Sequence, residues 1–251
     1  MPGPAGDTLD VTDDAILNGR LRLFQPRRGH RFGHDAILLA AAVPSKPGDR
    51  VAEFGAGVGA ASLALLARVA DIDATLFEID AALCSLARQN IDRNGFSDRA
   101  RAVTRDVTAP SAGEPFDHIF MNPPFNDERH RPSPEAARRL AHAAGPDLLA
   151  RWLDSARLSL RERGSVTLIW RADGLADVIE ALAAGYGRVS VLPVHPAPER
   201  PAIRVIATAE KGGAAPMCMS PPLILNDHSL RPSADAETVL RQGAALPLAQ
   251  R

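Results

Sequence analysis

Short apolar runs alternate with segments of helical periodicity along most of this chain, and this alternation constrains the fold more than any other feature. Five runs bounded by Gly, Pro or Asp have the composition of buried strands: residues 50–57, 74–80, 101–106, 116–122 and 165–170. Between them, apolar positions recur three and four residues apart, as in amphipathic helices, over residues 59–70, 81–95 and 145–164. Strands that alternate with helices fold as a parallel sheet with both faces covered. We therefore predict an α/β fold.

The segments outside this alternation complete the predicted domain. Residues 34–43 are apolar almost all round, which predicts a helix buried against the sheet. Residues 187–213 hold two strand-like runs joined by a Pro-rich loop, which predicts an antiparallel hairpin at the sheet edge. We expect residues 1–20 to form a flexible N-terminal arm and residues 21–251 a single domain, with a loose end from about residue 243.

Composition excludes several classes of protein. With 251 residues, 45% of them hydrophobic, the chain can bury a full core, so a disordered or fibrous protein is excluded. The formal net charge is −1, so any nucleic-acid surface has to be a local basic patch. Cys84 and Cys218 lack CxxC spacing and fit a reducing compartment without disulfides. No apolar run approaches the roughly 20 residues of a membrane helix, and the acidic N-terminus is unlike a signal peptide, so we expect a cytoplasmic protein.

A ligand site is predicted where the first strand ends. In "VAEFGAGVG", Gly55, Gly57 and Gly59 permit a tight turn and close approach of a ligand to the backbone before a helix begins. Open α/β sheets bind their ligands at this edge. The spacing GxGxG differs from the GxGxxG of dinucleotide enzymes, and a merely structural turn is the alternative.

Acidic residues end three successive predicted strands, namely Glu53, Glu78 and Asp106. Glu78 lies about 20 residues beyond the glycines, where an acid typically accepts hydrogen bonds from a ribose. The alternative is a solvated strand end or a helix cap, for which Asp80 is better placed. Asp106 suits a contact with an adenine amine and a helix cap equally well. Three acids at three strand ends favour a nucleoside ligand over three caps.

The fourth predicted strand ends in "NPPF", and here the chain resembles a known family. In this order, "EFGAGVG", "FEID", "RD" and "NPPF" look like the class I S-adenosylmethionine-dependent methyltransferases that methylate amino groups. The resemblance implies a Rossmann-like, seven-stranded sheet, parallel except for an antiparallel edge hairpin, with S-adenosylmethionine as cofactor. It also implies that residues 122–125 hold a planar, conjugated nitrogen, as in adenine, cytosine or a glutamine side chain.

The chemistry of such an amine explains the four residues of the tetrapeptide. A conjugated amine is a poor nucleophile, so the site has to localise its lone pair and align it with the methyl group. The Asn122 side-chain oxygen and the Pro123 carbonyl accept its two N–H groups, and Phe125 offers a face for stacking. Pro123 and Pro124 stiffen the loop and remove competing donors. No general base is required before transfer, and none is evident.

Segments on both sides of the core extend the resemblance over roughly residues 21–225. "RLRLFQPRRGHRFGHDAILLAAAV" and "RPAIRVIATAEKGGAAPMCMSPPLIL" resemble the bacterial tRNA1(Val) N6-adenine methyltransferases, which implies methylation of the adenine beside the anticodon. Phe32 and Asp35 then lie on the methionine side of the cofactor; the alternative for Asp35 is a first-turn acid stabilised by the helix dipole. The acidic N-terminal arm departs from the family pattern, and "NPPF" replaces the more usual "NPPY".

Two groups of arginines flank the predicted site and are predicted to contact phosphates of tRNA. They are Arg27, Arg28, Arg31, Arg129, Arg131, Arg138 and Arg139. The second group follows "NPPF" directly and is typical both of a lid at the rim of the site and of a solvated charge run. His30 and His34 have the spacing of a helical metal pair, but Gly33 interrupts it and no third ligand is near. We expect no metal, no membrane partner and a monomer.

Four other functions remain as alternatives. A protein-glutamine N5-methyltransferase shares the glycine loop and the tetrapeptide but commonly carries an extra N-terminal helical domain, for which we expect no room. Another rRNA or DNA amino-methyltransferase shares both motifs. A nicotinamide enzyme is disfavoured by the glycine spacing, and a non-catalytic cofactor-binding scaffold by the intact tetrapeptide and acids. The sequence therefore predicts N6-methylation of a tRNA adenine.

Overall fold

The computed structural model describes residues 10–28, 31–109, 113–124 and 147–250, and a mixed sheet forms its centre. Within these residues the sheet has nine strands, in the order β10-β8-β9-β7-β6-β3-β4-β5, with β11 also paired to β8. They are β3 (Arg50–Phe54), β4 (Asp73–Glu78), β5 (Ala100–Thr104), β6 (Phe116–Met121), β7 (Leu160–Arg171), β8 (Tyr186–His195), β9 (Arg204–Lys211), β10 (Cys218–Met219) and β11 (Leu223–Ile224). Only β9 runs antiparallel to its neighbours, β7 and β8. The predicted α/β sheet with one antiparallel hairpin is confirmed. The seven predicted strands are β3 to β9, and the two-residue strands β10 and β11 pair with β8 beyond the hairpin.

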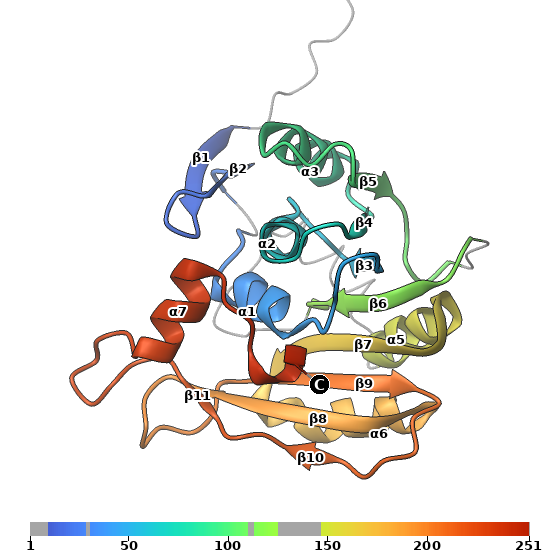
Figure 1. Ribbon diagram of the computed structural model, residues 1–251, viewed down its shortest axis with the longest axis vertical. Helices are drawn as coiled ribbons and strands as arrows, with labels where there is room; N and C mark the ends of the chain where they lie inside the picture. Colours follow the sequence, from blue (N-terminus) through green and yellow to red (C-terminus); the bar gives the residue numbers. More distant parts are fainter. Residues whose placement is uncertain (1–9, 29–30, 110–112, 125–146, 251) are drawn as a thin grey trace, which may run out of the picture.

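Helices cover both faces of the sheet (Figure 1). The first face carries α1 (His34–Ala42), α2 (Ala60–Arg68), α3 (Ala81–Arg93) and α7 (Ala234–Gln242), whose apolar residues form one core cluster with the sheet. The opposite face carries α5 (Leu148–Ser159) and α6 (Leu175–Ala183), which belong to a second cluster. A short helix, η1 (Ala172–Gly174), leads into α6. Adjacent residues of a strand alternate between the clusters, as Phe120 and Met121 do in β6.

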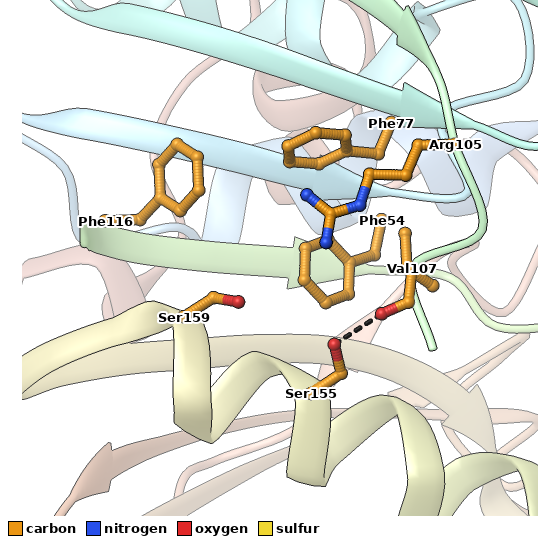
Figure 2. A pocket seen from close by; sticks show the side chains of 7 residues that line it. All are labelled: Phe54, Phe77, Arg105, Val107, Phe116, Ser155 and Ser159. Carbon is orange, nitrogen blue, oxygen red and sulfur yellow. Dashed lines mark hydrogen bonds between the residues drawn. The ribbon is translucent and has the colours of Figure 1, made fainter. Parts of the chain in front are cut away.

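Aromatic side chains from the ends of β3 and β4 and from the start of β6 meet in the second cluster (Figure 2). Phe77 meets Phe54 and Phe116 edge to face, with ring centroids 5.9 and 6.1 Å apart. Trp152 of α5 meets Phe54 in the same way at 6.5 Å. Edge-to-face pairs stabilise a core beyond their buried area. This packing fixes the position of α5 relative to the loop that follows β3.

A hairpin lies within residues 11–26, where the sequence predicted part of a flexible arm. Residues 1–20 were expected to form that arm, yet β1 (Val11–Ile16) pairs antiparallel with β2 (Leu21–Pro26). Asn90 of α3 anchors the hairpin, since its side chain bonds to the N–H of Phe24 at 2.7 Å and to its carbonyl at 2.9 Å. Side-chain contacts with distant parts of the chain therefore hold the hairpin in place. The polar sequence of β1 gives no sign of these contacts.

Two further boundaries differ from the prediction. The helix expected over residues 145–164 ends at Ser159, and residues 160–164 form the start of β7. Two arginines in this stretch pair with acids on neighbouring strands: Arg161 with Asp117 and Arg163 with Glu210. The end expected to be loose from about residue 243 packs instead: η2 (Pro247–Gln250) follows Leu246, whose N–H bonds to the Ala41 carbonyl at 2.7 Å. Among the residues that the structure describes, no helix has the length and apolar character to span a membrane.

Candidate active site

The glycine loop joins β3 to α2 at the carboxyl edge of the sheet. Gly55, Gly57 and Gly59 all have positive φ, at 69°, 56° and 87°, which explains why each is glycine. The N–H groups of Gly55 and Ala56 both donate to the Phe77 carbonyl of β4, at 2.9 and 3.0 Å. The loop is thereby fixed across the two strands.

The three glycines differ in what a side chain would meet. A Cβ on Gly55 would lie 2.6 Å from the Trp152 ring, and one on Gly59 would lie 2.9 Å from Leu76. A Cβ on Gly57 would meet nothing within 4 Å. Packing within the protein therefore requires Gly55 and Gly59, whereas Gly57 borders open space where a ligand can approach the backbone.

Glu78 ends β4 beside this loop and is held by it. Its Oε2 accepts from the Gly57 N–H at 2.7 Å, and its Oε1 accepts from the Asp80 N–H at 2.8 Å. Asp80 caps α3 by accepting from the N–H groups of Ala82 and Leu83, so the cap is Asp80 rather than Glu78. A carboxylate offers about four acceptor positions, so Glu78 can accept two further hydrogen bonds, as a ribose diol requires.

Glu53 is buried and bound within the fold. Its Oε2 accepts from both the N–H and the hydroxyl of Ser62, at 2.9 and 2.5 Å, which secures the first turns of α2. Burial raises the pKa of Glu53 to about 8; the hydrogen bonds from Ser62 oppose this shift and the Glu78 carboxylate adds to it. A direct contact between Glu53 and a cofactor stays a prediction.

Asp106 lies one strand further along the same edge. The N–H of Arg105 bonds to the Glu78 carbonyl at 2.8 Å, which places Asp106 next to the end of β4. Asp106 is exposed, and its Oδ1 accepts from the N–H of Thr108 at 2.8 Å and from its hydroxyl at 2.7 Å. These bonds close a turn and leave the other carboxylate oxygen for a ligand.

Asn122 follows β6 on the other side of the glycine loop. Met121 pairs with Phe54, so Asn122 lies level with Gly55, the first residue of the loop. The Asn122 Oδ1 is buried, yet it accepts no hydrogen bond in the part of the chain that the structure describes. Burying an amide oxygen without a donor is costly, so this atom fits an N–H group from a substrate. Pro123 is buried beside it, and Phe125 lies outside the described residues.

Phe32 and Asp35 flank the start of α1. Phe32 packs against the first core cluster, and its N–H donates to Gln25 at 3.2 Å. Asp35 occupies the first turn of α1, and its Oδ2 accepts from Arg204 Nε at 2.8 Å. The pairing with β9, 169 residues away in sequence, was not predicted.

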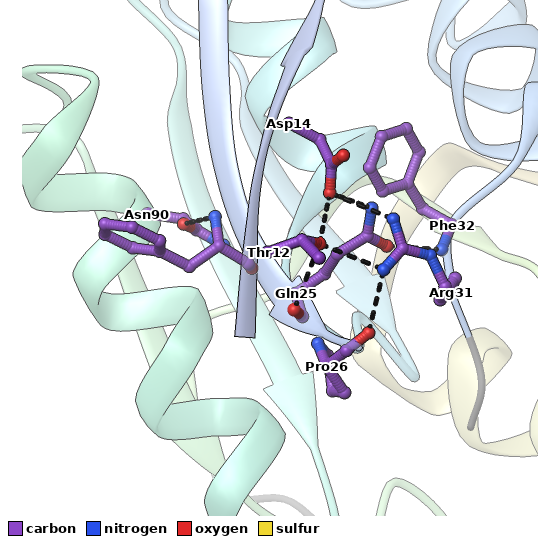
Figure 3. A network of polar contacts seen from close by, with 8 residues as sticks. Thr12, Asp14, Gln25, Pro26, Arg31, Phe32 and Asn90 are labelled. Atoms are coloured by element: carbon purple, nitrogen blue, oxygen red, sulfur yellow. Dashed lines mark hydrogen bonds and ion pairs between the residues drawn. The ribbon is translucent and has the colours of Figure 1, made fainter. Parts of the chain in front are cut away.

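The described arginines differ in their availability. Arg31 is bound within the fold: it donates to the Thr12 hydroxyl at 2.9 Å, to the Pro26 carbonyl at 3.0 Å and to Asp14 at 3.0 Å (Figure 3). Arg27 pairs with Asp10, and Arg28 is exposed. The other four predicted RNA contacts lie outside the described residues; they are Arg129, Arg131, Arg138 and Arg139.

Ile79 is a candidate site residue that the sequence prediction missed. It lies between Glu78 and Asp80 at the carboxyl edge, and it is 67% exposed. An exposed isoleucine next to the predicted ribose acceptor Glu78 is a candidate apolar contact for a nucleoside ligand. The available signal was an apolar residue between two acids in "FEID". In the residues described, no three His, Cys, Asp or Glu side chains gather as metal ligands would.

Comparison with known proteins identifies the family. The model of the methyltransferase small domain matches residues 31–193. A tRNA1(Val) (adenine(37)-N6)-methyltransferase from Bacteroides thetaiotaomicron is 27% identical over 157 residues, which cover 62% of this chain and 65% of that protein. A release factor glutamine methyltransferase from Chlorobaculum tepidum is 27% identical over 168 residues, covering 62% and 56%. The chain thus spans less than two thirds of either relative's length.

A similar fold is found in solved structures. The crystal structure of a predicted O-methyltransferase from Agrobacterium tumefaciens superposes with a TM-score of 0.71 and is 28% identical, covering 84% of this chain and 98% of that one. The glycine loop, Glu78 and Asp106 lie at the carboxyl edge of the sheet, where open α/β sheets bind their ligands. This chain belongs to the methyltransferase small domain family, and its cofactor is S-adenosylmethionine.

Proposed function

We propose that this protein methylates N6 of an adenine in tRNA, and that its substrate is the adenine beside the anticodon of tRNA1(Val). Two observations support the proposal: relatives of this chain are named tRNA1(Val) (adenine(37)-N6)-methyltransferase, and the chain itself carries the "NPPF" tetrapeptide. The observation that carries it is the Asn122 Oδ1 at the end of β6, which is buried and has no hydrogen-bond partner among the described residues.

The cofactor-binding residues follow from the same edge of the sheet. Glu78 is positioned for the ribose hydroxyls, Gly57 for close approach of the backbone, and Ile79 for the face of the adenine. Asp106 is predicted to accept from the adenine amine, with Phe32 and Asp35 on the methionine side. When bound, S-adenosylmethionine supplies an electrophilic methyl group.

The substrate amine is held by the chain itself. Its two N–H groups donate to the Asn122 oxygen and the Pro123 carbonyl, which draws the nitrogen lone pair out of conjugation with the ring and towards the methyl group. Charge develops on this nitrogen as it becomes tetrahedral, so both hydrogen bonds strengthen during transfer. Such a base has to leave its stack, and Phe125 supplies a face to replace the lost stacking.

The arginines provide affinity in this proposal, and the tetrapeptide provides chemistry. Arg27, Arg28 and the group after "NPPF" would bind phosphates without reading sequence. Arg31 is held by Asp14 and Thr12, so we assign it to the fold.

A labelling experiment tests the proposal. The purified protein is incubated with labelled S-adenosylmethionine and unmodified tRNA, and the RNA is digested to nucleosides for mass spectrometry. Label in N6-methyladenosine is expected, and tRNA1(Val) should be the best acceptor among purified species. Label that enters only a glutamine of a release factor, as the name of one relative suggests, would refute the proposal. Label only on an oxygen atom would also refute it.

A further inference from the structure

The segment after β5 carries Asp106, and a threonine fixes its carboxylate. Thr108 donates to Asp106 Oδ1 through both its N–H, at 2.8 Å, and its hydroxyl, at 2.7 Å. No described residue donates to the second oxygen of Asp106. The carboxylate is therefore anchored through one oxygen, and the other is directed elsewhere.

An arginine fixes the direction of the threonine hydroxyl. Arg151 Nη2 donates to Thr108 Oγ1 at 3.1 Å. Since a guanidinium can only donate, the hydroxyl oxygen accepts from Arg151 and its proton points to Asp106. The three side chains form a chain of hydrogen bonds with one direction, from Arg151 through Thr108 to Asp106.

Helix α5, which carries Arg151, contacts the segment after β5 at a second point. Ser155 lies one turn after Arg151 on the same face of α5, and its hydroxyl donates to the Val107 carbonyl (Figure 2). Trp152, between them in sequence, packs on Phe54 and against Gly55. The helix thus holds the Asp106 segment in register with the glycine loop.

From this arrangement we infer that Thr108, supported by Arg151 and Ser155, is a positioning residue that aims Asp106 at the N6 amine of the cofactor's adenine and so selects an aminopurine. The inference rests on the cofactor site described under the proposed function. An amine donates to the fixed carboxylate oxygen, whereas a 6-oxo group would place a second acceptor against it. A freely rotating carboxylate would discriminate less, because it could turn away from the 6-oxo group.

Two ligands that differ at this one position provide the test. Isothermal titration calorimetry measures Kd for S-adenosylhomocysteine and for S-inosylhomocysteine, in which a carbonyl replaces the amine. The wild-type protein should bind the first ligand about 10- to 100-fold more tightly, the range for a hydrogen bond to a charged group. Thr108→Val should reduce this preference about fivefold to tenfold, because the adenosine ligand binds more weakly while the inosine ligand binds as well as before or more tightly. Thr108→Ser should restore the preference, and Ser155→Ala should reduce it in part.

The controls separate positioning from folding. Thr238→Val removes an exposed hydroxyl on α7 and should leave both constants unchanged. Equal weakening of both ligands by Thr108→Val would overturn the inference, since it would show only a structural turn. So would an equal affinity of the wild-type protein for the two ligands. No RNA is present in these titrations, so a reduced preference upholds the inference even where the labelling experiment finds no N6-methyladenosine.

Discussion

Two buried carboxylates, Glu53 and Glu78, end adjacent strands and are held by different groups. Glu53 has the side chain of Ser62, and Glu78 has the backbone N–H groups of Gly57 and Asp80. The charge on Glu78 helps to keep a proton on Glu53, whose pKa is raised to about 8 chiefly by burial. At neutral pH Glu53 therefore largely keeps its proton, and it is bound by Ser62 within the fold.

The Glu53 carboxyl should make stability depend on pH. Its pKa in the folded state lies above the ordinary value of 4.5, so its contribution to stability is complete below pH 4.5 and is lost as pH rises to about 8. Glu53→Gln should remove this loss and flatten the free energy of unfolding between pH 5 and 8. Urea denaturation at several pH values measures the slope, with Glu180→Gln as an exposed control on α6. A slope identical to that of the wild type would contradict the assignment.

Glu78 should control affinity for the cofactor. Glu78→Ala removes the predicted ribose acceptor, so S-adenosylmethionine binding should weaken by about 1.5–3 kcal/mol, the range for hydrogen bonds to a charged group. Calorimetry on the folded variant measures this, and Glu180→Ala should bind as the wild type does. If Glu78→Ala bound S-adenosylmethionine with unchanged affinity, Glu78 would not be the ribose acceptor.

At the scale of elements, the loop between β3 and α2 serves both packing and binding. Alanine at Gly55 would place its Cβ 2.6 Å from Trp152, whereas alanine at Gly57 meets open space. Both substitutions add backbone strain of about 1–2 kcal/mol because φ is positive. Gly55→Ala should therefore lower the melting temperature more, and Gly57→Ala should weaken cofactor binding more than its loss of stability explains. Thermal denaturation and calorimetry on both variants measure these effects. If both variants changed the melting temperature and the cofactor affinity equally, the separate roles of Gly55 and Gly57 would be contradicted.

The strands and helices of the core were predictable because each has its own periodicity. The predicted strand over residues 74–80 is β4, and the helix over residues 81–95 is α3, within two residues at either end. Residues 11–16 were not predictable in this way. Their strand is held by ion pairs such as Arg93 with Asp13, whose partners are 80 residues apart. The start of β7 was also missed. Its charged residues fit a helix equally well, and the ion pairs that hold it in the sheet join residues far apart in sequence.

The candidate site was predictable where one short segment carries the chemistry. The glycine loop and Asn122 follow strands directly and Glu78 ends one, and the parallel sheet brings these strand ends together. The partners of Asp35 and Arg31 were not predictable, because a sequence does not show which distant side chain neutralises a charge. Asp106 suited two roles in the sequence, and in the structure it closes a turn through one oxygen while the other accepts nothing from the described residues.

At the scale of the whole molecule, the net charge is −1, so the proposed affinity for tRNA has to come from local arginines. Arg129→Ala with Arg131→Ala should raise the apparent Kd for tRNA and reduce its salt dependence by roughly 0.7–0.9 per lost phosphate contact. Filter binding across a salt series measures the slope. Arg101→Ala with Arg241→Ala, on exposed positions of β5 and α7, is the matched control and should leave it unchanged. If the Arg129→Ala, Arg131→Ala variant had the salt dependence of the wild type, these two arginines would not contact RNA.

The rate of methyl transfer by Asn122→Ala tests the central claim most directly. The substitution removes the buried oxygen that, in the proposed function, accepts from the substrate amine more strongly as the amine becomes tetrahedral. We predict that turnover of unmodified tRNA falls by roughly two to three orders of magnitude, by analogy with loss of one preorganised group in other active sites. Affinity for S-adenosylmethionine should stay at the wild-type value, as should the turnover of Gln89→Ala, which removes an exposed amide on α3. Transfer by Asn122→Ala at the wild-type rate would contradict the account.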